Sequence, residues 1–372
     1  MLAYLRDVGA TPGRAGHRRA LEAGRVALRC RRALAELFGI PGDPGRIAFQ
    51  LNATHALNVA LAGLLAPGDR VVRTVYDHNS VRRPVAGLRV HGVGETILAG
   101  SPDGTVDLDE AERALAGAAG EGAAKVLAIP HASNVLGTAL PVAELAERAH
   151  AAGAVVVLDA AQSAGHLPVD VAAMGVDVLA FTGHKGLLGP QGTGGLWIRE
   201  GIDLPPLLSG GTGSDSWDDQ MPRAMPDRLE AGTQNALGIA GLLAGVRWLA
   251  SHGSVAALHR QEAALKARLH AGLSALPGLR VLSPVAPDGV GIVTVAAAAM
   301  DAAELARRLD AEHGVLTRAG LHCAAEAHQV LGTLDCGAVR FSLGWASTEG
   351  DVDRAVAAVA AVLGGNNAPH VG

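Results

Sequence analysis

The chain has 372 residues, of which 49% are hydrophobic, 18% charged and only 3% aromatic, a composition typical of a globular enzyme with large aliphatic cores. Its net charge of -5 and its dispersed arginines disfavour nucleic acid as a partner. The sequence has no apolar run long enough to cross a bilayer and no basic start followed by an apolar run, so we expect a cytoplasmic protein that does not bind membranes.

Short β-branched runs alternate with helical stretches rich in Ala and Leu between about residues 70 and 198. This alternation predicts an α/β fold with a mostly parallel sheet, and the unbroken apolar runs predict strands covered by helices on both faces. The clearest predicted strands are residues 70–74, 125–129, 154–158 and 176–181. Because the carboxyl ends of parallel strands converge on one crevice, the polar residues that follow these strands predict a site there. They are His78, Asn79, Ser133, Asn134, Asp159, Thr182 and His184.

A second, smaller pattern follows a long predicted helical region, residues 231–276. Its expected strands and helices are residues 279–282, 290–295 and 339–343, and residues 301–312 and 348–363, respectively. The Gly- and Pro-rich residues 205–213 and 215–226 predict a long loop that is functional or bridges subunits. The predicted organisation is an N-terminal segment (1–20), a large domain (21–245) and a smaller α+β domain (246–372).

The strongest local signal is the run FTGHK from Phe181 to Lys185, which places a lysine just after a predicted buried strand. Burial disfavours the ammonium form, so the Lys185 amine can act as a nucleophile and bond to an aldehyde cofactor, although a single lysine is more often a surface residue in a turn. The predicted Gly-rich turn of residues 186–195 follows this lysine, and it does not match the phosphate-loop pattern GxxxxGK, which disfavours an NTPase.

Two further motifs suit a pyridoxal cofactor. Such a cofactor needs a carboxylate that keeps its ring nitrogen protonated, so that the ring accepts electrons from the substrate. Asp159, at the end of a predicted strand and three residues before Gln162, fits that task, although an isolated aspartate at such a place more often caps a helix or a turn. Thr54, near the start of a predicted helix, either binds a phosphate there or caps the helix.

The ordered motifs Ala53-Thr54, His78, Ser133-Asn134, Asp159 to Gln162 and Gly183-His184-Lys185 resemble the class V aminotransferase-fold enzymes, and among them most closely the cysteine desulfurases and selenocysteine lyases. The resemblance extends from about residue 4 to residue 363. It implies fold type I of the pyridoxal 5′-phosphate enzymes, in which helices enclose a mostly parallel sheet of the seven-stranded type beside a smaller α+β domain. It also implies a homodimer that acts on an amino acid such as L-cysteine, with a sulfur-acceptor protein as a possible partner.

Position by position, the resemblance also implies roles. Lys185 would carry the cofactor, Asp159 would contact its ring nitrogen and Gln162 its ring hydroxyl, while His78 would stack on the ring. The implied phosphate ligands are Thr54, Thr182, His184 and Thr233, the last of which would reach across to the partner subunit. Ala53 and Asn134 complete the implied cofactor-binding set, and the implied substrate-binding residues are Asn134, Arg318 and Arg340.

The C-terminal motifs indicate which substrate and reaction to expect. Three cysteines are an odd and sparse set for a secreted scaffold, so we expect reduced thiols. In the desulfurases that this chain resembles, a cysteine takes the substrate's sulfur as a persulfide and an arginine on the following strand holds the substrate carboxylate, and Cys323 and Arg340 match those positions. A free cysteine is more commonly a small buried apolar residue, which is how we interpret Cys30 and Cys336.

The sequence also has features that bear on alternative functions. The spacing of His322, Cys323, His328 and Cys336 is not that of paired metal ligands, so we expect no metal site. Selenocysteine lysis, carbon–sulfur lysis of a specialised thioether and transamination on the same cofactor stay open. Lys185, Asp159 and Arg340 together argue against an inactive sulfur-transfer scaffold, and the missing GxGxxG fingerprint argues against a dehydrogenase.

Three positions depart from the pattern of the family that the chain resembles. Asp7 to Thr11 stands where Asn-Ala-Ala-Thr is usual. Ser347 replaces a common Asn before Thr348, and His55 stands where an acidic residue is frequent. We expect the first departure to alter any substrate contact made by that segment.

Overall fold

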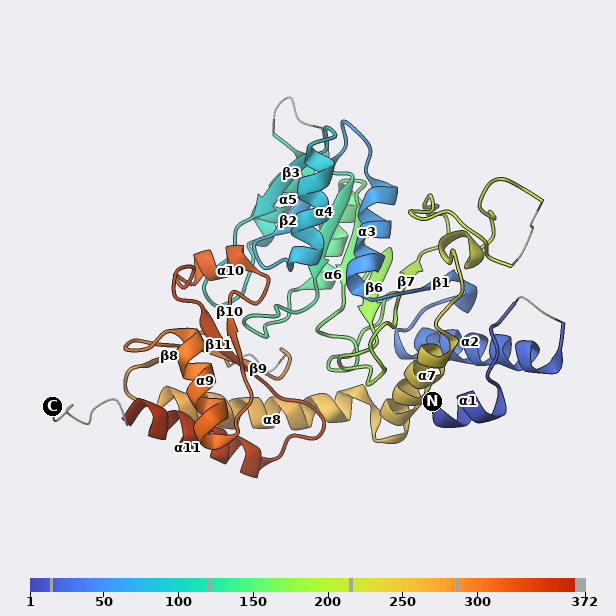
Figure 1. Ribbon diagram of the computed structural model, residues 1–372. Helices are drawn as coiled ribbons and strands as arrows, with labels where there is room; N and C mark the ends of the chain where they lie inside the picture. Colours follow the sequence, from blue (N-terminus) through green and yellow to red (C-terminus); the bar gives the residue numbers. More distant parts are fainter. Residues whose placement is uncertain (14–15, 119–121, 214–216, 286–287, 365–372) are drawn as a thin grey trace.

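The computed structural model of the chain describes residues 1–372 apart from residues 14–15, 119–121, 214–216, 286–287 and 365–372. Within these ranges the chain forms two sheets (Figure 1), of which the larger has seven strands in the order β1-β7-β6-β5-β4-β2-β3 and the smaller has four in the order β10-β11-β9-β8. The strands are β1 Ile47–Gln50, β2 Arg70–Thr74, β3 Gly94–Leu98, β4 Val126–Pro130, β5 Val155–Asp159, β6 Val178–Thr182, β7 Gly194–Ile198, β8 Leu279–Val281, β9 Ile292–Ala297, β10 Arg318–Gly320 and β11 Ala338–Ser342.

Helices precede, connect and follow these strands. They are α1 Leu2–Asp7, α2 Arg18–Leu37, α3 Ala53–Leu64, α4 Asn79–Arg89, α5 Leu108–Ala116, α6 Val142–Ala151, α7 Ala236–Ser251, α8 Ser254–Ser274, α9 Ala302–His313, α10 Ala325–Val330 and α11 Glu349–Gly364, with short 3-10 turns at Pro44–Arg46 and Asp227–Leu229. None of the described helices combines the length and the apolar character needed to cross a membrane. Residues 205–213 and 217–226 contain no helix or strand, as predicted, whereas residues 215–216 of that predicted loop lie outside the described residues.

The large sheet is mostly parallel, as predicted. Strands β2 to β6 run in one direction, and β7 is antiparallel to both of its neighbours, β6 and β1. All four strands predicted from apolar runs are confirmed, as β2, β4, β5 and β6. The apolar runs do not predict β1, β3 or β7, because β3 is a partly exposed edge strand and β7 begins inside a Gly-rich run.

Helices cover both faces of this sheet, which is why its strands lack polar alternation. Neighbouring residues of a strand point to opposite faces, so Val156 and Leu158 of β5 join one core while Val157 joins another. The first core contains apolar residues of α2, α5, α6 and α7, and the second contains those of α3 and α4. The site at the end of the sheet is therefore framed by buried, closely packed elements.

The predicted Gly-rich turn ends earlier than expected, because Gly194 and Gly195 open β7 instead of closing the turn. A side chain cannot be accommodated at either position. A Cβ on Gly195 would lie 2.3 Å from the Phe181 ring, and a Cβ on Gly194 would lie 2.8 Å from the Asn52 backbone. These glycines permit close approach of strand β7 to β6 and to the start of α3, which a sequence pattern cannot distinguish from turn chemistry.

The smaller sheet is antiparallel and has its own core. Figure 1 shows the long helix α8 leading from α7 to this sheet, and α8 packs against α11. The predicted strands and helices of this region are confirmed as β8, β9, β11, α9 and α11, while β10 was not predicted. Helix α7 crosses the expected boundary at residue 245, so the division of the chain into domains stays a prediction.

A buried lysine on α8 leads to a stability prediction. Lys266 is 2% exposed, its Nζ has no hydrogen-bond partner in the described part of the chain, and burial lowers its pKa from 10.5 to about 8. Between those two pH values the unfolded chain binds more protons than the folded one. The buried ammonium group of Lys266 therefore destabilises the fold fully below about pH 8, and this destabilisation disappears as the pH rises through about 10. Lys266→Met keeps the length of the side chain and removes the charge.

We expect Lys266→Met to raise the free energy of unfolding at neutral pH by about 1–3 kcal/mol. The gain should shrink toward zero as the pH approaches about 10. Urea unfolding of the two proteins at both pH values measures this difference. A gain that is equal at both pH values, or a variant that is less stable at neutral pH, would contradict the account.

Candidate active site

The carboxyl ends of β2, β4, β5 and β6 meet at one edge of the large sheet, where a cavity of about 260 Å³ lies. Because these strands are parallel, residues far apart in the sequence are brought together there. The predicted site residues that line this cavity are Ala53, Thr54, His78, Asn134, Asp159, Gln162, Thr182, His184, Lys185 and Arg318. Five predicted residues do not line it, namely Asn79, Ser133, Cys323, Arg340 and Thr233, of which Asn79 and Cys323 line a neighbouring groove.

Lys185 lies three residues after the end of β6 and stands in this cavity, so its side chain is accessible although protein surrounds it. Desolvation lowers the pKa of its amine, and the Asp159 carboxylate opposes this effect. The positive charges of Arg340 and Arg318 lower the pKa further. The amine therefore loses its proton more readily than an ordinary lysine, which favours its use as a nucleophile or base.

Asp159 ends β5 and is only 6% exposed. Its Oδ1 accepts a hydrogen bond from the Ala161 N–H at 2.9 Å, so the carboxylate does shape the turn after the strand. That bond occupies one oxygen and leaves the second one for a ligand in the cavity. Asp159 and Lys185 thus lie in the same pocket, as the expected chemistry requires.

His78 precedes α4 and is held in one orientation. Its Nδ1 accepts the Ser80 N–H at 3.0 Å and lies 2.9 Å from the Ser80 hydroxyl. Because Nδ1 is an acceptor, neutral His78 carries its proton on Nε2. Burial lowers the pKa of this imidazole, the Asp159 charge opposes that effect, and Lys185 adds to it, so the uncharged ring is favoured. Ser80 was not predicted, and its place two residues after His78 at a helix start is the signal that could have identified it.

The start of α3 forms one wall of the cavity. Asn52 caps this helix, because its side chain accepts the His55 N–H at 3.0 Å, so Thr54 is not the cap. Ala53 and Thr54 line the cavity at the end of the helix where backbone N–H groups have no intrahelical partner, an arrangement that suits a phosphate. Thr182 lies on another wall, with its Oγ1 2.9 Å from the ring nitrogen Nδ1 of His184.

The cavity contains an unused polar atom. Asn134 donates from Nδ2 to the His322 carbonyl at 2.6 Å, whereas its buried Oδ1 has no hydrogen-bond partner among the residues that the structure describes. A buried polar atom without a partner is costly, and a ligand in the cavity would satisfy it. Pyridoxal 5′-phosphate fits the polar groups of this cavity, which are the Asn134 amide oxygen, the Lys185 amine, the Asp159 carboxylate and the N-terminal N–H groups of α3.

Cys323 lies beside the cavity, in a groove of about 600 Å³ that Thr54 and His78 also line. Arg318 donates from Nη2 to the Cys323 Sγ at 3.6 Å. The Cys323 carbonyl accepts the Asn79 N–H at 2.8 Å, which ties the turn to the residue after His78. The thiol therefore faces a solvent-connected groove at the margin of the cavity.

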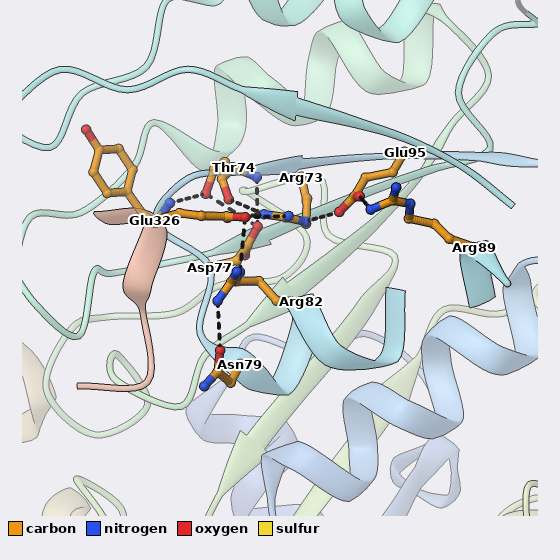
Figure 2. A network of polar contacts seen from close by, with 9 residues as sticks. Arg73, Thr74, Asp77, Asn79, Arg82, Arg89, Glu95 and Glu326 are labelled. Carbon is orange, nitrogen blue, oxygen red and sulfur yellow. Dashed lines mark hydrogen bonds and ion pairs between the residues drawn. The ribbon is translucent and has the colours of Figure 1, made fainter. Parts of the chain in front are cut away.

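An ion-pair network fixes the segment that follows this cysteine. Figure 2 shows Arg73 of β2 between two carboxylates, Glu95 and Glu326. Arg73 is 3% exposed and donates to the two oxygens of Glu326 at 2.6 and 2.9 Å, while Arg82 lies 3.1 Å from the same carboxylate. Glu326 lies in α10, three residues after Cys323, so the network joins the segment that contains Cys323 to the large sheet. No local sequence pattern indicates this pair, because 253 residues separate its members.

The remaining predicted residues lie outside the cavity. Arg340 on β11 is the cross-strand partner of Arg318, and its Nη1 donates to the Asn134 carbonyl at 2.9 Å. Thr233 is exposed and lines a separate pocket with Gly192 and Asn235. Its predicted phosphate contact is therefore not made within its own subunit, and contact with a partner subunit stays a prediction.

The other two cysteines differ from Cys323 in their surroundings. Cys30 is fully buried, and burial raises the pKa of its thiol to about 12. Cys336 is exposed and lines neither the cavity nor the groove. No group of three or more potential metal-ligating side chains in the described part of the chain could hold a metal ion.

Comparison with known proteins adds a family and several relatives. The family model described as "Aminotransferase class-V" matches residues 1–355. A relative named "Probable cysteine desulfurase" from Methanothermobacter thermautotrophicus is 33% identical over 95% of this chain and 87% of its own length. A protein named "Cysteine desulfurase" from Haloferax volcanii is 32% identical over 80% of this chain and 70% of its own.

Solved structures agree with these relatives. The apo structure of a cysteine desulfurase from Thermococcus onnurineus has a TM-score of 0.89 and 33% identity, and the match covers 98% of this chain and 90% of that one. A cysteine desulfurase from Escherichia coli, described as an S-sulfonic acid, has a TM-score of 0.83 and 29% identity over 94% of this chain and 87% of that one. The fold expected from the sequence is thereby confirmed.

Proposed function

Because this chain belongs to the class-V aminotransferase family, we propose that it is a pyridoxal 5′-phosphate-dependent cysteine desulfurase that moves the sulfur of L-cysteine to Cys323 and releases alanine. One observation carries this proposal. A single cavity holds the Lys185 amine and the Asp159 carboxylate, and the Cys323 thiol lies at its margin with an arginine at 3.6 Å. The names of the relatives support the same activity.

The residues of the cavity would hold and assist the cofactor. When bound, pyridoxal phosphate supplies an aldehyde for the substrate amine and a ring that accepts electrons from the substrate's α-carbon. Lys185 would hold the cofactor through its amine, and its Nζ would take the substrate's α-proton, a role that its lowered pKa favours. Asp159 would keep the ring nitrogen protonated, and the N-terminus of α3 would bind the phosphate.

Cys323 performs the step that distinguishes this reaction. Its sulfur, which lies 3.6 Å from Nη2 of Arg318, attacks the sulfur of the bound substrate as a thiolate. A sulfur–sulfur bond forms, the carbon–sulfur bond breaks, and its electron pair stays with the carbon, which takes a proton to give alanine. The persulfide on Cys323 then remains in the groove until an acceptor thiol or a reductant removes its outer sulfur.

Two further roles belong to this proposal. Arg340 is half-buried, and it donates from Nε to the Ser342 hydroxyl at 3.2 Å and from Nη1 to the Asn134 carbonyl at 2.9 Å. The remaining N–H groups on Nη1 and Nη2 would bind the substrate carboxylate in a forked arrangement. Thr233 is exposed and outside the cavity of its own chain, which supports a homodimer in which this residue reaches the partner's phosphate site. A sulfur-acceptor protein would approach through the groove that Cys323 lines.

Product analysis of the purified holoenzyme tests the proposal. Incubated with L-cysteine and a reducing thiol, the enzyme is expected to form alanine and sulfide in equal amounts. Pyruvate in place of alanine would contradict the proposal and indicate carbon–sulfur lysis, and consumption of an added keto acid would indicate transamination. Turnover of selenocysteine without turnover of cysteine would favour a selenocysteine lyase.

A further inference from the structure

A chain of buried hydrogen bonds lies beneath the Cys323 turn. His322 Nε2 is 3.0 Å from the Arg318 carbonyl oxygen, and His322 Nδ1 is 3.0 Å from His328 Nε2. His328 Nδ1 is in turn 2.8 Å from the Thr333 hydroxyl. His322, His328 and Thr333 are 2%, 0% and 1% exposed, and none of them lines the cavity or the groove.

The direction of these hydrogen bonds follows from the first acceptor. The carbonyl of Arg318 can only accept, so Nε2 of His322 must donate. Burial lowers the pKa of both imidazoles to about 4, so each carries one ring proton at neutral pH. His322 Nδ1 is then an acceptor, which makes His328 Nε2 a donor and His328 Nδ1 the acceptor of the Thr333 hydroxyl. A single arrangement of protons satisfies the whole chain.

The turn above this chain needs support. His322 and Cys323 have φ angles of 52° and 59°, in the left-handed region that is strained for a non-glycine residue. Their carbonyls are held from the large-sheet side, by the Asn134 side chain at 2.6 Å and by the Asn79 N–H at 2.8 Å. The buried hydrogen bonds of the His322 ring hold the same turn from its other side.

The same series of hydrogen bonds also fixes the start of strand β10, where Arg318 lies. By accepting from His322, the Arg318 carbonyl is locked relative to the turn, and with it the 3.6 Å separation between Arg318 Nη2 and Cys323 Sγ. Loss of the His328 donor would leave the buried His322 Nδ1 without a hydrogen-bond partner, which is destabilising. The imidazole would then be free to leave the position that supports both residues.

We propose that His328, supported by Thr333, is a positioning residue for sulfur transfer, because it donates the hydrogen bond that locks His322 and thereby aims the Cys323 thiol. The kinetic part of this inference rests on the proposed desulfurase activity. His328 lines neither the cavity nor the groove, so its loss is expected to slow sulfur transfer without weakening the binding of cysteine.

A matched pair of variants separates the donated hydrogen bond from mere packing. His328→Gln can place an amide N–H near the position of Nε2, whereas His328→Leu fills similar space without a donor. With the holoenzyme, we expect kcat for alanine formation to fall about 10- to 100-fold in the leucine variant, with KM within about twofold of the parent. The glutamine variant should retain at least about a third of the parental kcat.

Nuclear magnetic resonance of protein carrying isotope-labelled histidine gives a second readout that does not depend on turnover. In the parent, His322 and His328 are both expected as the neutral tautomer with the proton on Nε2, and the His322 Nε2–H should exchange slowly with water. That protection should persist in His328→Gln and be lost in His328→Leu. Should the leucine variant fail to fold, Thr333→Val and Thr333→Ser provide the same comparison, with valine impaired and serine retaining activity.

Three results would overturn the inference. They are a parental kcat in both His328→Leu and Thr333→Val, equal impairment within each matched pair, or a His322 that carries its proton on Nδ1. Failure of the proposed function is distinguishable from these results. A parent enzyme in which both histidines carry the proton on Nε2 but which does not desulfurate cysteine would contradict the proposed activity. The buried series of hydrogen bonds would still be established.

Discussion

Lys185→Ala is expected to abolish both the cofactor's visible absorbance and alanine formation, with turnover reduced at least about 10⁴-fold. In the proposed mechanism one amine serves twice, as the covalent attachment of the cofactor and as the base for the substrate's α-proton. Its lowered pKa and its position in the cavity beside Asp159 suit both tasks. Spectra of the purified protein with added pyridoxal phosphate, together with an alanine assay, measure the two effects.

The composition of the chain makes this experiment well controlled. The chain has three lysines, Lys125, Lys185 and Lys266. Lys125 is exposed and lines none of the pockets at the candidate site, so Lys125→Ala should retain the absorbance and the activity. Borohydride reduction of the parent should attach the cofactor to the peptide that contains Lys185. Attachment at another lysine, or full activity in Lys185→Ala, would contradict the assignment.

Cys323→Ala is expected to separate cofactor chemistry from sulfur transfer. The cavity proposed to hold the cofactor is not lined by Cys323, so the variant should bind pyridoxal phosphate and still change its spectrum when cysteine is added. Release of alanine and sulfide should fall at least about 100-fold, because the nucleophile that takes the sulfur is missing.

The exposed Cys336 provides the matched control for this variant. Cys336→Ala should desulfurate cysteine at the parental rate, because this residue lines neither the cavity nor the groove. Full cysteine desulfurase activity in Cys323→Ala would refute the nucleophile assignment. Activity that survives in that variant with selenocysteine alone would favour a selenocysteine lyase, since selenium leaves carbon more readily than sulfur.

Residues at strand ends could be predicted from the sequence, and the structure shows why. Apolar runs identify buried parallel strands, and the polar residue after each run is delivered to the same edge of the sheet. Asn134, Asp159, Thr182 and Lys185 follow three adjacent strands in this way, and all four line one cavity. These residues lie close together because their strands are adjacent and run in the same direction.

Contacts between distant segments could not be predicted in this way. The pair of Arg73 and Glu326 joins a strand of the large sheet to a helix 253 residues later, and neither residue stands in a distinctive local pattern. His322 and His328 were considered as metal ligands, because residue type and spacing cannot show that two buried rings contact each other. Only the fold, with its left-handed turn at Cys323, brings these side chains into register.

The most direct test of the desulfurase assignment follows the substrate's sulfur. Holoenzyme is mixed with a limiting amount of L-cysteine carrying isotopically labelled sulfur, thiols are trapped by alkylation, and the tryptic peptides are sequenced by mass spectrometry. Residues 319–340 form one tryptic peptide that contains both Cys323 and Cys336, so fragment ions must place the label. The account predicts one additional labelled sulfur on Cys323, whereas label on Cys336 or free sulfide with no sulfur bound to the protein would contradict it.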